Sequence, residues 1–390
     1  MAHPSRIRRK KRVRTALYIS FLSIPISCAT IAKEGQGDVD LPVAYAGPFR
    51  SLKRGQVCDG DVCNGVDELP PGTSDGLAKA PGSPRSRSPT ALVRGTGLSD
   101  DYDVVLYVAR DLAADPARIA RMEAKDARTF DDVVDVIDAS EPFEGTSVGD
   151  PWAIEVSGEV WLYYAVHPQP GKSSVIAGIA RARSSDGRAG RSFVKDAAPL
   201  LDEAGPKGAW ETEAPRAPSV VRDDAGTFHL FYASGVAIGE ATSTDGVHFA
   251  RVDGDPSTPS IDPVVKPSEP VDLATLPTGV KPPFDDLAVD DPSVLRSISP
   301  LGRVVYHLHY TGRDRRGGSA IGLAGRFGEN GSFERAVGAV FGGRQNPHVN
   351  APAVARFPSF ALLYCNVDHD TAQAIGVAVS PAAVKLPIKE

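Results

Sequence analysis

The chain has 390 residues, of which 42% are apolar and 7% aromatic, and it carries a formal net charge of −6. This composition places it in the globular class, with enough residues to bury a large core. Because the basic residues form no stripe after residue 55, a nucleic-acid partner is not expected.

The N-terminus carries a basic segment, RIRRKKRVR from Arg6 to Arg14, followed by the apolar run ALYISFLSIPIS. A charged segment before an apolar run too short to span a bilayer predicts a secretory signal over residues 1–28. Three fates of this signal are compatible with the sequence. Cys28 stands where a bacterial lipoprotein carries its lipid, and Ser27-Cys28-Ala29 also fits the cleavage site of an ordinary secreted protein. The third possibility is that the segment stays uncleaved as a membrane anchor. All three predict an extracytoplasmic protein, secreted or lipid-anchored in a bacterial envelope, that meets a membrane only through this segment.

Residues 29–87 are rich in Pro, Gly and Ser, which predicts a disordered linker rather than a folded segment. Cys58 and Cys63 lie within it, and in an oxidising compartment their spacing predicts a small disulfide loop. No further ligands lie near them, so no metal site is predicted there. Cys365 follows in an apolar run and is interpreted as a buried thiol.

From residue 88 onward one pattern is written five times. Its copies open at Ser88, Asp150, Ala217, Asp291 and Ala351, each followed by Pro, and these openings lie about 60–75 residues apart. Each copy continues with a short apolar run, an aromatic-rich alternating run and a strand of small residues. Four short strands per repeat predict an all-β fold, a five-bladed β-propeller over residues 88–390. We expect the protein to be a monomer.

The segments VDDPSVL, TFHLFYASG and IGEATSTDGVHF resemble blades of the arabinanase, β-xylosidase, levansucrase and invertase superfamily of five-bladed glycoside hydrolase propellers. The resemblance covers residues 85–390. It implies a carbohydrate partner, no required cofactor, and three carboxylates at one mouth of the central channel: a base or nucleophile, a second Asp and a Glu general acid. Cleavage of a glycosidic bond needs one proton donor with a raised pKa and one ionised carboxylate.

Carried over residue by residue, the resemblance implies catalytic roles for Asp150, Asp291 and Glu213. The two aspartates stand at Asp-Pro openings, whereas Glu213 lies in WETEAPRAP, three residues earlier than the pattern requires. The other openings are Ser88, Ala217 and Ala351, which hold no acid. Asp150 takes the base role only if the blade numbering is shifted by one.

Further polar and aromatic residues flank the openings. We predict substrate binding by Trp152, Trp210, Arg216, Asp290, His348 and Asn350. The same oxygen-rich loops also suit a structural Ca²⁺ ion, although Asp and Asn are common in loops simply because they cap turns. His229, His307 and His309 lie in the aromatic-rich runs and are interpreted as packing residues.

Two functional hypotheses follow. The first is an exported glycoside hydrolase acting on a furanoside- or xyloside-type glycan. The second is a surface propeller that has lost catalysis and binds a glycan or a protein, as the Ser and Ala openings indicate. The sequence contains no zinc-peptidase, serine-hydrolase or P-loop motif.

Overall fold

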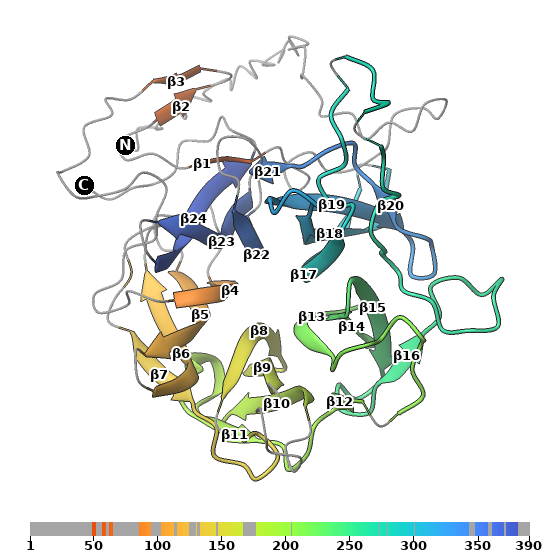
Figure 1. Cartoon of the computed structure of the whole chain (residues 1–390). Helices are drawn as coiled ribbons and strands as arrows, with labels where there is room; N and C mark the ends of the chain where they lie inside the picture. The colour runs from red at the N-terminus through yellow and green to blue at the C-terminus, as the bar shows by residue number, and fades with distance from the viewer. Residues whose placement is uncertain are drawn as a thin grey trace, which may run out of the picture.

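The protein is a five-bladed β-propeller (Figure 1). The computed structural model describes residues 49–51, 57–59, 62–64, 86–94, 103–112, 115–124, 130, 133–145, 147–166, 177–203, 205–272, 274–278, 280–299, 301–342, 348–357, 361–369 and 372–380. Five antiparallel sheets surround a central axis, and each sheet runs from an inner strand to an outer one. The all-β propeller expected from the repeat is therefore confirmed.

The strands follow the same order in every blade. Blade one contains β4 (Ser86–Arg94), β5 (Asp103–Leu112), β6 (Asp115–Ala124) and β7 (Val134–Ile137). Blade two contains β8 (Val148–Val156), β9 (Glu159–Val166), β10 (Gly178–Ser184), β11 (Phe193–Lys195) and β12 (Leu201–Asp202). Blade three contains β13 (Arg216–Arg222), β14 (Phe228–Ser234), β15 (Ala237–Ser243) and β16 (Ala250–Val252). Blade four contains β17 (Ala288–Ile298), β18 (Val304–Arg313), β19 (Ser319–Phe327), β20 (Glu334–Arg335) and β21 (Phe341–Gly342).

Blade five joins the two ends of the chain. Its inner strands are β22 (Val349–Arg356), β23 (Ala361–His369) and β24 (Ala372–Ser380), and its outer strand is β1 (Arg50–Ser51). Phe49 precedes β1, is buried, and donates its backbone N–H to the Val340 carbonyl of blade four at 2.9 Å. Residues 49–51 fall in the span predicted as a linker, and the structure instead places them in the propeller.

The core lies between the blades rather than inside any one sheet. The second strand of each blade is covered on both faces, so in β14 every side chain is buried. One apolar cluster joins blades five and one, another joins blades one and two, and a larger one joins blades two, three and four. This sandwiching explains why the second strands are aromatic-rich and nearly continuous in apolar character.

The small residues of the third strands leave room for aromatic rings. Gly239 of β15 pairs with Tyr232 of β14, and a Cβ atom at Gly239 would lie 2.6 Å from the Tyr232 ring. Gly322 of β19 is equivalent, because a Cβ atom there would lie 2.4 Å from the ring of Tyr310. Glycine at this position therefore lets a tyrosine lie flat across the sheet.

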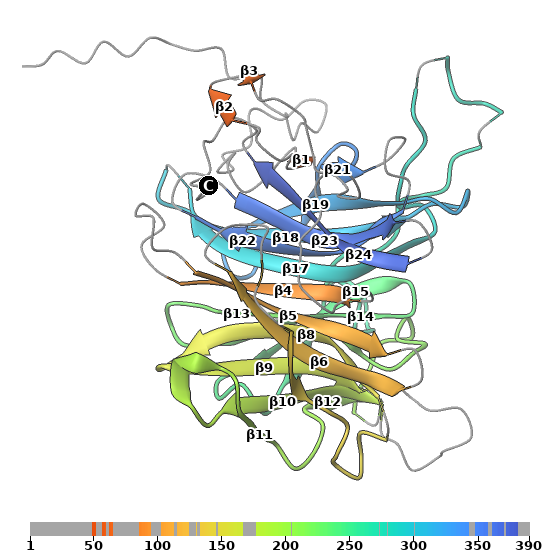
Figure 2. The same cartoon turned by 90° about the vertical axis from the view of Figure 1, so that its left-hand side faces the viewer.

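A separate two-stranded hairpin, β2 (Val57–Asp59) and β3 (Val62–Asn64), lies outside the ring of blades in both views (Figures 1 and 2). Cys58 and Cys63 are direct partners across this hairpin. Their side chains, and the whole of Cys28 with the predicted signal segment, lie outside what is described, so the disulfide and the signal remain predictions. Within the described residues, no helix is long and apolar enough to cross a membrane.

The five repeat openings share one backbone conformation. Ser88, Asp150, Ala217, Asp291 and Ala351 have φ angles of 49°, 44°, 49°, 47° and 51°, respectively. The register shifts at each of them, so the opening residue and its proline form a bulge in the inner strand. A bulge needs no ladder hydrogen bond from proline, and it turns the side chain before the proline out of the sheet.

Candidate active site at the channel mouth

The five bulges meet around one cavity, which we call the channel mouth. Its lining consists of the five opening residues, their five prolines and Trp152. The cavity volume is about 20 Å³, which is room for roughly one water molecule. Of the five openings, only Asp150 and Asp291 bring a carboxylate into this lining.

Asp291 is held by hydrogen bonds from blades four and five. Its Oδ2 atom accepts the Thr311 hydroxyl at 2.9 Å and the Ala351 backbone N–H at 3.3 Å. The Ala351 N–H also donates to the Thr311 hydroxyl oxygen, at 2.9 Å. The carboxylate is therefore fixed in orientation.

The pKa of Asp291 is displaced toward neutrality. Burial raises it, and the negative charges of Asp290 and Asp150 raise it further. The guanidinium groups of Arg216 and Arg313 oppose the shift, but the pKa still reaches about 7. At neutral pH this carboxyl group therefore exists in both protonation states.

Arg216 brings a positive charge close to the carboxylates of the channel mouth. Its Nη1 atom contacts Oδ1 of Asp290, whose Oδ2 atom also lies 3.5 Å from Arg313. Burial lowers the pKa of Arg216, but the charges of Asp290, Asp291 and Asp150 outweigh it and raise the pKa well above its ordinary value. Asp290 thus forms ion pairs with two arginines, and these arginines only partly offset the rise in the pKa of Asp291.

Asp150 is held from blade one. Its Oδ1 atom accepts the Ser88 hydroxyl at 2.9 Å and lies 3.7 Å from Nη1 of Arg87. The Ser88 backbone N–H in turn donates to Oδ1 of Asn366 in blade five, at 2.8 Å. Each aspartate therefore accepts a hydrogen bond from a neighbouring blade and also lines the cavity.

Three other predicted residues lie at or beside the channel mouth. Trp152 lines it and donates its indole N–H to the Val220 carbonyl of blade three at 2.8 Å. Asn350 precedes the fifth opening, and its Oδ1 atom accepts the Asn366 side chain at 2.7 Å. Glu213 is not part of the lining: its side chain is 61% exposed and lies 3.7 Å from Arg216.

The structure does not bring the two remaining residues into the channel mouth. Trp210 stacks on Tyr232 with ring centroids 6.0 Å apart and donates to the Ile261 carbonyl at 3.1 Å, so it packs against the outer part of blade three. His348 is exposed and forms an isolated bridge with Ser319 at the start of β22. Substrate binding by either residue remains a prediction.

Sequence reasoning missed Thr311, which donates to Asp291, and Asn366, which accepts the backbone N–H of Ser88, although a signal exists for both. The second strands of the blades can be aligned by their pairing with the inner strands. In this alignment, Thr311 and Asn366 each stand two residues after the position that Tyr107 occupies in β5 and Tyr163 occupies in β9. The equivalent residues in blades one, two and three are alanines, so polar residues appear at this position only in blades four and five. The comparison across copies that selects the openings would have selected these two as well.

Solved structures with the same architecture include several glycoside hydrolases. A glycosyl hydrolase from Bacteroides ovatus is 16% identical with a TM-score of 0.57, over 89% of this chain and 98% of that chain. The structure of an RGII complex is also 16% identical with a TM-score of 0.57, over 81% of this chain and 94% of the other. A thermostable family-43 glycoside hydrolase is 13% identical with a TM-score of 0.55, over 80% and 95%.

No family model matches the chain, and no curated protein matches it. At such low identities the structural likenesses establish the fold and leave the activity to be argued from the site. The resemblance to five-bladed glycoside hydrolase propellers is therefore confirmed for the fold of this chain.

Proposed function

We propose that the protein is an exported glycoside hydrolase that cleaves a furanoside- or xyloside-type glycan with the carboxylates of the channel mouth. The observation that carries this proposal is the pairing of Asp150 and Asp291 in one cavity, with the pKa of Asp291 raised to about 7. A carboxyl group with that pKa suits proton donation to the leaving oxygen at neutral pH. Asp150 supplies the second carboxyl group of the pair.

Two other residues have subsidiary roles in this proposal. Arg216 carries the positive charge that keeps several carboxylates together and offers hydrogen bonds to sugar hydroxyls. Glu213, exposed beside Arg216, is available as a further acid at the rim. A structural Ca²⁺ ion in the oxygen-rich loops beside the openings stays a prediction.

The competing proposal is a propeller that binds a glycan without cleaving it. The absence of an acid from Ser88, Ala217 and Ala351 and the small volume of the cavity favour this alternative. A sugar would then rest over the channel mouth on Trp152 and Arg216 rather than between two carboxylates.

A single set of assays separates these proposals. Purified protein is incubated with arabinan, xylan, levan and aryl glycosides, beside the variants Asp150→Asn and Asp291→Asn. Hydrolysis by the wild type that falls at least about 100-fold in both variants is expected for general acid–base catalysis. Wild-type rates equal to those of both variants on every substrate would eliminate the hydrolase, and glycan binding without turnover would support the alternative.

A further inference from the structure

A second cluster of ionisable groups lies at the other end of the inner strands. Asp223 directly follows the C-terminal end of β13, whereas Ala217 near its N-terminal end lines the channel mouth. His229 belongs to β14, and Glu329 lies in the loop after β19. The cluster therefore joins blade three to blade four, away from the cavity described above.

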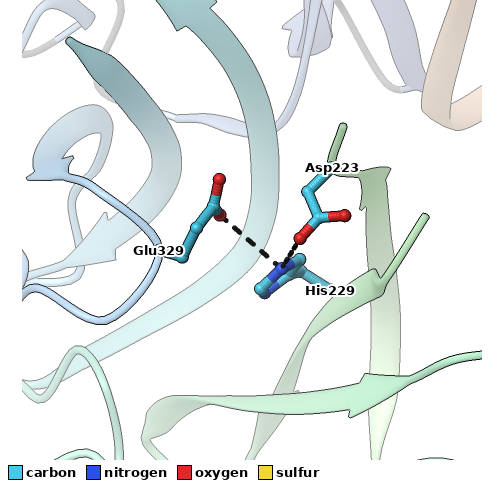
Figure 3. Close-up of side chains that lie close together, drawn as sticks. All are labelled: Asp223, His229 and Glu329. Carbon is cyan, nitrogen blue, oxygen red and sulfur yellow. Dashed lines mark ion pairs between the residues drawn. The ribbon is translucent and has the colours of Figure 1, made fainter. Parts of the chain in front are cut away.

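The three side chains converge on one point. The Nε2 atom of His229 lies 3.5 Å from Oδ2 of Asp223 and 3.7 Å from Oε2 of Glu329. All three ligand atoms lie within 4.8 Å of one another. Figure 3 shows both carboxylates directed at the imidazole ring.

His229 is only 5% exposed, and its buried Nε2 atom makes no hydrogen bond. The other ring nitrogen, Nδ1, lies 2.8 Å from Oε1 of Glu240. Glu240 is ion-paired with Arg326 at 2.5 Å, so it acts as the acceptor and Nδ1 carries the proton. In the neutral ring, the lone pair of Nε2 then points at two carboxylate oxygens, which is unfavourable unless a cation lies between them.

The surrounding hydrogen bonds orient all three groups toward that point. The Oδ1 atom of Asp223 accepts the Thr227 backbone N–H at 2.7 Å, which leaves Oδ2 facing His229. The Oε1 atom of Glu329 lies 3.1 Å from Arg296, and Tyr306 donates its hydroxyl to Oε2.

We propose that Asp223, His229 and Glu329 bind a divalent transition-metal ion of the zinc class that links blade three to blade four. Two ligand atoms each about 2.1 Å from a tetrahedral zinc ion lie roughly 3.4 Å apart, close to the 3.5 and 3.7 Å that separate Nε2 of His229 from the two carboxylate oxygens. An imidazole ligand favours zinc over calcium or magnesium, which take oxygen ligands. The Glu240 carboxylate behind Nδ1 is the outer partner that zinc-binding histidines usually have.

The alternative occupant of this point is a proton on Nε2, which would make His229 an imidazolium ion between two carboxylates. A proton requires no metal, so the two readings differ in whether added zinc binds and stabilises the protein. They also differ in whether Co²⁺, used in place of zinc, develops the visible absorption of a tetrahedral site.

The test uses the untagged full-length protein, freed of metal with a chelator and titrated with Zn²⁺ by calorimetry, with the melting temperature measured in parallel. We expect one ion to bind and the melting temperature to rise with its concentration. His229→Gln should weaken binding at least about 100-fold, because loss of an outer partner alone weakens it about 10- to 100-fold. Glu329→Gln, at a side chain one-third exposed, provides a second variant if His229→Gln does not fold.

The matched control is His248→Gln. His248 also faces a carboxylate, with Nδ1 2.7 Å from Asp245, but its side chain is 87% exposed. Its variant should bind zinc as the wild type does. The proposal is overturned if zinc neither binds nor stabilises the wild type, or if His229→Gln and Glu329→Gln respond to zinc as the wild type does.

Discussion

Asp291 shows how one residue is set by opposing electrostatic effects. Burial and two neighbouring carboxylates disfavour its charged form, and two arginines and the Thr311 hydroxyl favour it. The effects that disfavour the charged form are the larger ones, so the pKa of Asp291 rises to about 7 and the carboxyl group keeps its proton up to about that pH. The identity of the residue was visible in the sequence, but this balance was not, because its terms come from three different blades.

Replacement of Asp291 by Asn should change how stability depends on pH. Because the pKa is raised in the folded protein, folding retains a proton that the unfolded chain loses above its own pKa of 3.8. The folded state therefore loses stability as pH rises from about 4 to about 7, and the loss is complete above pH 7. Asp291→Asn should be more stable than the wild type at pH 8, with a difference that shrinks toward pH 4 in thermal melts. A difference that does not vary with pH would contradict the raised pKa.

Replacement of Thr311 by Val should raise the pKa of Asp291 further. Valine has the same shape but cannot donate to the carboxylate, so the charged form loses one hydrogen bond, worth about 1 pKa unit. Thr311→Ser keeps a hydroxyl and serves as the control. The readout is the pH dependence of glycoside hydrolysis, and an unchanged profile in Thr311→Val would show that this hydroxyl does not act on Asp291.

At the scale of strands, the five bulges place five side chains around one axis at the expense of backbone strain. A non-glycine residue with φ near +50° costs about 1–3 kcal/mol, and each inner strand contains one. Such a repeated strained position marks where the fold presents residues to the channel. Two of the five positions are alanines, Ala217 and Ala351, so the positive φ angle also occurs where the side chain is not polar.

Ala217 allows this strain to be measured without removing a polar contact. Ala217→Val should lower the free energy of unfolding by about 1–3 kcal/mol, because a β-branched side chain disfavours positive φ. Ala217→Gly should be within about 1 kcal/mol of the wild type, because glycine adopts this conformation freely. Urea denaturation gives both values, and equal stability of the two variants would argue against the strained bulge.

The contact between blades three and four should be sensitive to loss of Arg326. Its guanidinium pairs with Glu240, and both side chains are nearly fully buried. Arg326→Leu should cost about 3–5 kcal/mol, because it leaves a buried carboxylate without its cation. Adding Glu240→Gln removes that charge and should recover part of the loss. No recovery in the double variant would mean that packing, rather than charge, dominates.

For the molecule as a whole, the ring is closed by the N-terminal side of the chain. The β1 strand pairs with β24, and Phe49 packs between blades four and five. Pairing of the last blade with a strand from the opposite end of the chain holds the two ends of the propeller together and covers part of the outer edge of β24.

Phe49→Ala should therefore lower the free energy of unfolding by about 3–5 kcal/mol, the usual cost of deleting a buried phenylalanine ring. Val337→Ala, at a side chain with 80% exposure, should stay within about 0.5 kcal/mol of the wild type. Chemical denaturation of both variants tests this, and equal stabilities would mean that Phe49 does not help to close the ring.

Much of this architecture could be predicted from the sequence, because the repeat fixes the number of blades and the openings fix the channel wall. The closing strand could not, since two residues in a Pro- and Gly-rich stretch carry no periodicity. The sequence identified Asp150 and Asp291 as residues of the site. Trp210 was predicted beside them, but it packs against blade three because its indole stacks on Tyr232. Hydrogen bonds between blades depend on three-dimensional neighbours that one repeat does not reveal.

The most direct test of the central claim is the pH dependence of kcat/KM for glycoside hydrolysis by the wild type, beside Asp291→Asn. If Asp291 is the proton donor, the wild-type rate should fall above a pKa of about 7, and Asp291→Asn should lose most activity together with that limb. A wild-type profile without a limb near pH 7, or an Asp291→Asn variant as active as the wild type, would contradict the assignment of the channel mouth as the catalytic site.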